Sequence, residues 1–301
     1  MSISFKKKSS ITNPEITDLH IRIDQVDKEL LQILELRADL VFQLGHLKKQ
    51  NDLPLYDPST EQESRTKIRS LVSKDCVLKV DEMGSLFTSI VECYRNLEEF
   101  HMNKDQVLNS TEKTLIDFSK PHTVVLFNFG YLSSSLYLAL NNSLPLWNFK
   151  VFGKDIDADA FERWKKDRGV ENIELINKDQ LRTGEIFILG GCAESNKSLI
   201  TDFEFPKSAI VFDIGEGNME TVTHFQQQCE RKYQSYTFIG GRPRIYSELT
   251  SFEYADASLF YGKTFCWVTP NPRFVEFRTQ ATFDRFAKLI GAKPVWTDVA
   301  G

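Results

Sequence analysis

The sequence has no long hydrophobic run, no paired-cysteine motif and no strong excess of charge of one sign. No apolar stretch approaches the ~18 residues that a membrane-spanning helix needs. The basic start, MSISFKKKSS, is not followed by the apolar segment of a secretory signal. A net charge of -5 does not favour general binding to nucleic acid or to membrane surfaces.

The cysteines are few and scattered, without the CxxC spacing of a zinc site or a redox motif. We read them as small buried apolar residues in a reducing compartment, without a metal or a disulfide framework. The chain has 301 residues, of which 41% are hydrophobic and 26% charged. This composition is typical of a globular protein, and the length favours about two domains. We therefore expect a soluble, cytoplasmic, two-domain protein.

Helix-breaking residues are rare in the first fifty positions. No proline lies between Pro14 and Gln50, and the only glycine is Gly45. Apolar residues recur at helical spacing, at Leu19, Ile23, Val26, Leu30, Leu34, Val41, Leu44 and Leu47. The pattern predicts one helix of about 35 residues, with Asn13 as its cap. Such a helix is too long to stand alone, so we expect it to pack against other helices, including helices of a partner chain.

Two further helices are expected in the first hundred residues, one after Asp57 and Pro58 and one from about 80 to 100. On the long helix, Arg37 and Lys48 stand where the apolar stripe would continue. They lie eleven residues apart, which is three helical turns, and so face the same way. Either they reach the surface or pair with acidic residues, or they face a bound anion.

The string IRIDQVDKELLQILELRADLVFQLGHLKKQNDLPLYDPSTEQE resembles the helical (AroQ-type) chorismate mutase domain that opens the bifunctional chorismate mutase/prephenate dehydrogenases. The resemblance covers roughly residues 15–100. It implies an intertwined helical dimer that converts chorismate to prephenate by holding a dianion in a compact conformation. That reaction needs positioning and cations, and it needs no nucleophile.

The resemblance also implies roles for individual residues. Arg37 takes the place of the arginine that clamps a substrate carboxylate, and Lys48 that of the lysine at the ether oxygen. Asp57 and Glu61 match the pair that contacts the substrate hydroxyl. Glu98 stands opposite the ether oxygen, where it must be protonated in order to donate.

Two positions depart from the family pattern. His20 and Thr60 stand where the family has arginines, the first of them contributed across the dimer. Losing two bidentate carboxylate contacts, at ~1.5–3 kcal/mol each, costs on the order of 10²–10⁴ in transition-state binding. We therefore predict that the mutase activity is weak or that the module is repurposed.

The second half of the chain has a different pattern of apolar residues. We place the helical domain at 1–105, a linker without apolar periodicity at 106–121, and a second domain at 122–301. In this domain short apolar runs, which begin near positions 123, 149, 185, 209 and 265, alternate with helical stretches. The alternation predicts a Rossmann-type α/β domain with a parallel sheet and right-handed crossovers. The predicted fold class is therefore α + α/β.

The turn after the first apolar run lies where a dinucleotide-binding fold carries GxGxxG. Only the middle glycine, Gly130, is present, while Asn128 and Ser133 replace the outer two. Tyr131 and Leu132 lie between them, and Asp155 follows the second run at the place of the acid that holds the NAD ribose. The altered loop fits an empty domain as well as one that binds NAD.

The string YTFIGGRPRIYSELTSFEYADASLFYGKTFCWVTPNP, followed by LIGAKPV, resembles the nucleotide-binding domain of prephenate dehydrogenases. With the βαβ start and the AIVFDIG string, this resemblance covers about 123–299. The fused arrangement is similar to the bifunctional family of tyrosine biosynthesis. It implies NAD-dependent oxidation of prephenate, in which loss of carbon dioxide aromatises the ring.

This half also departs from its family. Arg242 replaces the histidine that accepts the proton of the oxidised hydroxyl, and a guanidinium cannot accept it. Glu216 replaces the serine that binds the substrate, and its charge would repel a dicarboxylate. The sequence stops at Gly301, where family members continue into a helical dimerisation domain. These changes predict an inactive dehydrogenase. Arg242 is equally compatible with a structural ion pair to Glu216 or Glu248.

Three hypotheses follow. The first is an active bifunctional enzyme of the shikimate pathway with unusual side chains, and the second a divergent enzyme acting on another chorismate-derived molecule. The third is a non-catalytic regulator that binds a ligand or a partner enzyme. We favour a dimeric relative of the family whose helical site still binds a chorismate- or prephenate-like dicarboxylate, and whose dehydrogenase half is inactive.

Overall fold

The computed structural model describes residues 14–72, 77–153, 156–215, 218–232, 237–269 and 275–297. The chain divides into two compact units, Met1–Tyr94 and Arg95–Gly301. The third helix runs across the division, so its first half belongs to the helical unit and its last turns to the α/β unit.

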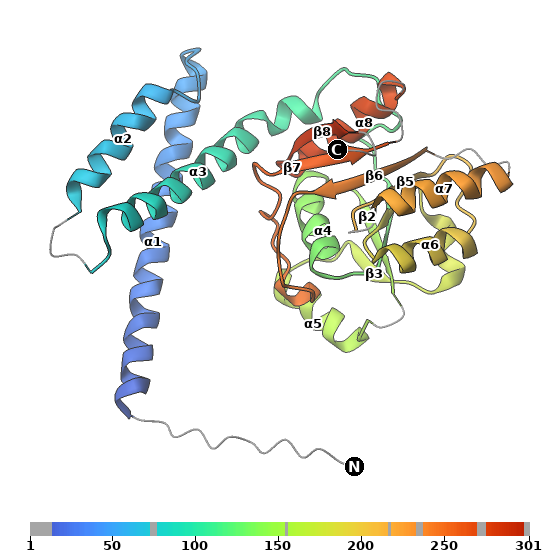
Figure 1. The fold of residues 1–301 in the computed structure, drawn as a ribbon, viewed down its shortest axis with the longest axis horizontal. Coiled ribbons are helices and arrows are strands. Elements are labelled where there is room, and N and C mark those ends of the chain that lie inside the picture. The colour runs from blue at the N-terminus through green and yellow to red at the C-terminus, as the bar shows by residue number, and fades with distance from the viewer. Residues whose placement is uncertain are drawn as a thin grey trace. The chain divides into compact units, whose positions relative to one another are not determined.

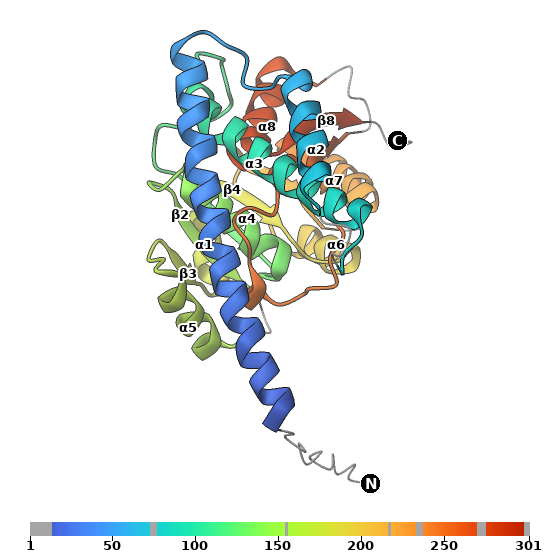
Figure 2. The same cartoon turned by 90° about the vertical axis from the view of Figure 1, so that its left-hand side faces the viewer.

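The helical unit contains the elements that the sequence predicts. Helix α1 spans Pro14–Gln50, α2 spans Pro58–Leu71, and α3 spans Val80–Leu108. At ~1.5 Å per residue, the 37 residues of α1 extend for about 55 Å, and both views show one unbroken helix (Figures 1 and 2). Asp57 caps α2, as predicted. The predicted cap Asn13 lies outside the described residues, and α3 continues beyond the predicted end near 100.

One face of α1 carries an exposed apolar stripe. Its members alternate at spacings of four and three, and each side chain is between 50% and 64% exposed: Leu19, Ile23, Val26, Leu30, Ile33, Leu40, Leu44 and Leu47. This is the seam pattern of a helix that packs along another helix. Arg37 occupies the one position of the seam between Ile33 and Leu40 that is not apolar.

The α/β unit is built on an eight-stranded sheet in the order β3-β2-β1-β4-β5-β6-β7-β8. The first six strands follow the arrangement of dinucleotide-binding folds, in which the order reverses between β1 and β4. The strand bounds are Thr123–Phe127 for β1, Asn148–Phe152 for β2, Ile173–Leu175 for β3, Ile186–Leu189 for β4, Ile210–Asp213 for β5, Thr237–Pro243 for β6, Thr264–Val268 for β7 and Lys293–Thr297 for β8.

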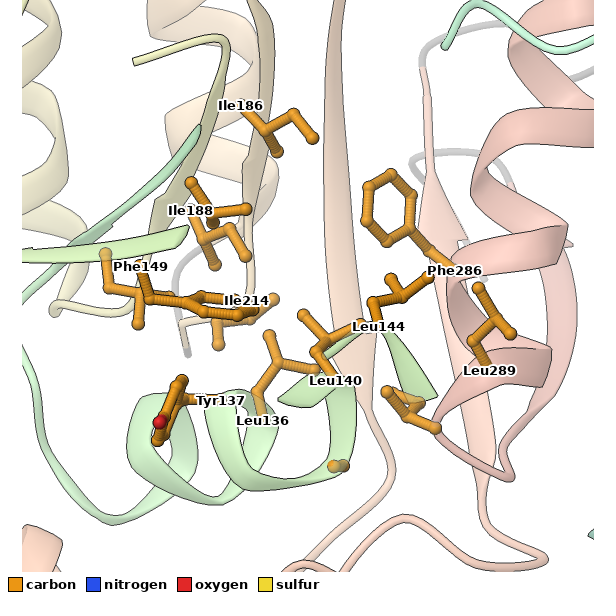
Figure 3. Packing of buried hydrophobic residues seen from close by; sticks show 14 of the residues in the cluster. Leu136, Tyr137, Leu140, Leu144, Phe149, Ile186, Ile188, Ile214, Phe286 and Leu289 are labelled. Atoms are coloured by element: carbon orange, nitrogen blue, oxygen red, sulfur yellow. The ribbon is translucent and has the colours of Figure 1, made fainter. Parts of the chain in front are cut away.

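Two hydrophobic clusters lie on the two faces of the sheet. The larger one packs α4 (Tyr131–Ser143), α5 (Ala158–Arg168) and α8 (Phe277–Leu289) against one face. Figure 3 shows Leu140 and Tyr137 of α4 beside Phe149 of β2, with Phe286 from α8. The smaller cluster packs α6 (Ala193–Asp202) and α7 (Asn218–Lys232) against the other face.

One strand pair differs from the predicted parallel sheet. Strand β7 runs antiparallel to β6, whereas every other described pair is parallel. The connection between them carries only the short helix η2, Phe252–Tyr254, instead of a crossover helix that would return the chain to the starting edge. We call residues 244–256 of this connection the strap. In Figure 1 it descends in orange past α4 towards α5.

The helices were also compared with the length and apolarity that a membrane span requires. None of those in the described ranges meets both conditions.

Candidate functional site

The helical unit holds a half-buried arginine against an aromatic ring. The Arg37 guanidinium carbon lies 4.6 Å from the centre of the Tyr94 ring. The Tyr94 hydroxyl donates to the main-chain oxygen of Leu34, which fixes the ring beneath the cation. Burial raises the pKa of Tyr94, and the nearby Arg37 opposes this rise. Arg37 Nη1 is fully buried and has no hydrogen-bond partner among the described residues. This guanidinium is therefore in place and has a free donor.

Lys48, the second cation of the predicted site, lies at the last turn of α1. Its Nζ donates to the main-chain oxygen of Leu55 at 2.7 Å, and its own carbonyl accepts from the amide of Leu53 at 2.9 Å. Lys48 thus ties down the loop that leads to α2. The ammonium has two further donors for an anion.

Asp57 is engaged by its own helix. It accepts from the Ser59 amide at 3.0 Å, from the Ser59 hydroxyl at 2.7 Å and from the Thr60 hydroxyl at 2.8 Å. These bonds, led by that from the Ser59 hydroxyl, lower the pKa of Asp57. The Thr60 hydroxyl therefore serves the cap of α2. Glu61 lies on α2 with its side chain outside the described part, and Glu98 is a buried residue of α3, 7% exposed.

His20 lies on α1, exposed to solvent and seventeen residues before Arg37. At ~1.5 Å per residue this is about 25 Å along the helix axis. A side chain at position 20 therefore cannot reach the Arg37 of its own chain. It can meet an Arg37 site only from a second copy.

The predicted dinucleotide loop lies at the carboxyl end of β1. Asn128 has a positive φ of 59°, the left-handed conformation expected when asparagine replaces glycine. Gly130 is the N-cap of α4, and Ser133 is buried in the first turn. The Ser133 hydroxyl lies in the space that a Cβ would take at Gly190, so a serine is tolerated because position 190 is glycine. Leu132 is half-buried against the core, and Asp155 lies outside the described residues.

The strap covers the amino end of α4. The amide of Tyr131 donates to the main-chain oxygen of Thr250 at 2.9 Å, and that oxygen lies 3.0 Å from where a Cβ would sit on Gly130. The Tyr131 hydroxyl is hydrogen-bonded to Ser247, while burial and the nearby Asp256 raise its pKa. In a loaded fold of this class, the space beside Gly130 and the free helix amides hold the pyrophosphate. Here a carbonyl oxygen fills this space, so the arrangement does not fit a bound pyrophosphate.

The crevice between β1 and β4 is also bridged. Asn128 Nδ2 donates to the Ser195 hydroxyl of α6 at 3.1 Å, across the point where the strand order reverses. Beside this bridge lies a cavity of about 280 Å³, with apolar walls that include Phe152 and Leu199 and with Lys178 among its charged residues. This cavity is empty of protein atoms, whereas the phosphate position beside Gly130 is filled by the Thr250 carbonyl.

Arg242 lies on β6 opposite Cys266 of β7, and its side chain is exposed. Among the residues that the structure describes, its guanidinium has no ion pair, which removes the predicted alternative of a pair with Glu248. Glu216 lies outside the described residues. A guanidinium, which is not a proton acceptor, therefore stands near the carboxyl edge of the sheet.

Asp213 ends β5 and is buried, with an exposure of 0%. It accepts from the Gly215 amide at 2.7 Å and from Asn196 Nδ2 at 3.0 Å. Burial raises its pKa to about 6, although these bonds and one from Thr221 oppose the rise. Asn196 also bonds both main-chain groups of Gly191, so this pair holds the turn after β4.

The sequence did not predict the groups that contact these sites from distant positions in the chain. Tyr94 stands one turn before Glu98, and this spacing could have indicated that it faces the same site. Thr250 gave no signal, because its main-chain oxygen carries no residue-type information. Asp213 could have been found as an acid within an apolar strand run.

Fold and site together define a class: a helical unit with a cationic site, joined to an α/β unit of the dinucleotide-binding type. Residues 19–99 match the family described as chorismate mutase type II. The T-protein of Haemophilus influenzae is 31% identical over 86 residues, which are 28% of this chain and 22% of that protein. Both matches confirm the resemblance predicted for the helical segment, and the matched segment spans about a fifth of that relative's length.

Solved structures were compared as well. The prephenate dehydrogenase of Aquifex aeolicus has a TM-score of 0.49 and 15% identity, over 58% of this chain and 61% of that one. The Synechocystis arogenate dehydrogenase has a TM-score of 0.45 and 16% identity, over 59% and 60%. The chain thus spans less than two thirds of these proteins. The assignment of the α/β fold stands on the strand order of the chain itself.

Proposed function

We propose that the helical unit binds a chorismate- or prephenate-like dicarboxylate. The observation that carries this proposal is Arg37, whose cation is held by Tyr94 while Nη1 is buried without a partner in the described part. A buried, unmatched guanidinium donor is unfavourable until an acceptor meets it. A carboxylate is the acceptor whose geometry suits it best.

The chemistry of this site is the rearrangement of chorismate to prephenate, at a reduced rate. Cations that hold a compact dianion are sufficient for such a reaction, because no group of the protein forms a bond to the substrate. Arg37 and Lys48 supply two of these cations. Thr60 is bonded to Asp57 and adds no charge, so the carboxylate binding that an arginine would provide is missing.

We further propose that two copies pair through α1. The side chains of its apolar seam are each at least half exposed along most of the helix, and contiguous exposed apolar surface of this kind marks an interaction site. Pairing would bury this seam and would bring position 20 of one copy towards the Arg37 site of the other. A homodimer is therefore part of the proposed site.

For the α/β unit we propose a relative of the tyrosine-pathway dehydrogenases that does not oxidise prephenate. Hydride loss from a ring alcohol requires a group that accepts the hydroxyl proton. The guanidinium of Arg242 offers donors and no acceptor for that proton. NAD is the cofactor that the fold class suggests for this unit, but the Thr250 carbonyl beside Gly130 does not fit its pyrophosphate.

The test uses the full chain and natural substrates. Purified protein is mixed with chorismate, and loss of its ultraviolet absorbance is followed; NAD⁺ is then added and NADH absorbance is recorded. We expect slow chorismate loss that Arg37→Ala abolishes, and no NADH. Arg22→Ala, an exposed arginine on the same helix, is the matched control.

Two results would contradict the proposal. NADH formation from prephenate would show that Arg242 does not block the oxidation. Absence of both chorismate turnover and calorimetric binding of chorismate or prephenate would show that the helical site has lost its ligand. In that case the third hypothesis, a non-catalytic regulator, is favoured in the form that binds a partner enzyme.

A further inference from the structure

We propose that the strap is a built-in occupant of the dinucleotide site and keeps the α/β unit closed to NAD⁺. The first amides of a helix have no acceptor within the helix, and they are the groups that bind a cofactor phosphate. In this structure the Tyr131 amide is taken by the Thr250 carbonyl, at 2.9 Å. A carbonyl oxygen and a phosphate oxygen cannot share this position.

The strap is anchored close to Thr250 by an aromatic contact. The Phe252 ring lies 5.9 Å from the ring of Phe129, a residue of the dinucleotide loop itself, and 6.0 Å from the Trp164 ring of α5. Strap and loop are thus packed against each other, so lifting Thr250 also requires separating these rings.

Polar contacts fix the strap beyond this ring. Arg168 Nη2 at the end of α5 donates to the Ala255 carbonyl at 2.8 Å and to that of Glu253 at 3.5 Å. The Asp256 amide donates to the buried Ser135 hydroxyl at 3.0 Å. These contacts join the strap to α5 and to α4, whose amino end is the phosphate position, so the closed form is stabilised from both helices.

This inference goes beyond the proposed function and does not depend on Arg242. Arg242 concerns the chemical step, whereas the strap concerns binding of the cofactor in the absence of any substrate. A protein could fail to oxidise prephenate and still bind NAD⁺. Binding measurements therefore separate the two ideas.

The experiment measures NAD⁺ and NADH binding to the full chain by calorimetry, and hydrogen exchange of the Tyr131 amide. For the wild type we expect a dissociation constant weaker than about 1 mM and a slowly exchanging Tyr131 amide. Each of two variants, Arg168→Ala and Phe252→Ala, removes one of the contacts that anchor the strap. Arg163→Ala, an exposed arginine on the same helix, is the control. Arg168 is exposed, so its replacement leaves the core intact even if Phe252→Ala destabilises the fold.

Both readouts should change by the same factor. Apparent affinity scales with the fraction of open molecules, and so does exchange through local opening. We expect each anchor variant to bind NAD⁺ at least about 10-fold more tightly than the wild type. Its Tyr131 amide should exchange faster than that of the wild type by the same factor. Wild-type binding tighter than about 1 mM, or a Tyr131 amide that exchanges at the unprotected rate, would overturn the proposal. Faster exchange in Arg168→Ala without gained affinity would overturn it as well.

Discussion

The Arg37 guanidinium lies over the face of the Tyr94 ring, 4.6 Å from its centre, and one of its nitrogens is buried without a described partner. The two residues come from different helices, 57 positions apart in the sequence. The ring positions the cation and the buried nitrogen leaves a donor for a ligand. This relationship is the basis of the predictions for the helical unit.

Replacing Arg37 should weaken ligand binding. Because a charge-assisted contact to a carboxylate contributes ~1.5–3 kcal/mol, Arg37→Ala is expected to raise the dissociation constant for chorismate by about 10- to 150-fold. Calorimetry measures this change. Arg37→Lys should recover part of the loss, and an unchanged affinity in Arg37→Ala would place the ligand elsewhere.

Restoring the family arginines should increase mutase activity. The double variant His20→Arg and Thr60→Arg returns two carboxylate contacts, and we expect kcat/KM to rise by on the order of 10²–10⁴. Each single variant should give part of this gain. The assay is the loss of chorismate absorbance, and no gain in the double variant would show that these positions do not limit the rate.

A charge in the α1 seam should dissociate the proposed dimer. In Val26→Glu, two like charges would face an apolar seam of the partner helix, which is unfavourable to bury. We expect sedimentation velocity to shift from dimer to monomer. Gln25→Glu, beside the seam, should leave the dimer intact; a wild-type monomer at micromolar concentration would refute the pairing.

A histidine at position 242 should not be sufficient for dehydrogenase activity. Arg242→His supplies a proton acceptor, but the strap still fills the phosphate position. We expect no NADH from prephenate with this variant alone, measured at 340 nm as in a standard NADH assay. NADH formation in Arg242→His would show that the strap does not exclude the cofactor.

Asp213 should make stability depend on pH. The pKa of Asp213 is raised to about 6 in the folded chain. The neutral carboxyl therefore contributes its full stability to the fold below pH ~4, and this contribution is lost as the pH rises through 6. An amide keeps the bonds from Gly215 and Asn196 and cannot ionise. The free energy of unfolding of Asp213→Asn is therefore expected to exceed that of wild type by about 1–3 kcal/mol at pH 8, and by about a third of that amount at pH 4.5. Urea unfolding at both pH values measures this, and equal curves at pH 8 would contradict it.

Much of the fold follows from local sequence patterns. Helical spacing from Pro14 to Gln50 predicted α1, and the Asp57-Pro58 pair predicted the start of α2. Five apolar runs predicted strands of the sheet, because side-chain burial on both faces leaves near-continuous hydrophobic segments. The left-handed backbone of Asn128 also fits its residue type, because asparagine is one of the few residues other than glycine that adopt this conformation readily.

The sequence by itself therefore determined the two-part architecture, five of the eight strands, and the residue types present in each site. Only the tertiary structure decided that β7 runs antiparallel to β6, that the Tyr94 ring lies under Arg37, and that the Thr250 carbonyl accepts a hydrogen bond from the Tyr131 amide. These contacts join segments up to 119 positions apart. The last of them is made by a main-chain oxygen, whose place depends on the path of the strap and not on the side chain it carries. Periodicity reports which face of a segment is buried, whereas the partner across the contact is chosen by packing.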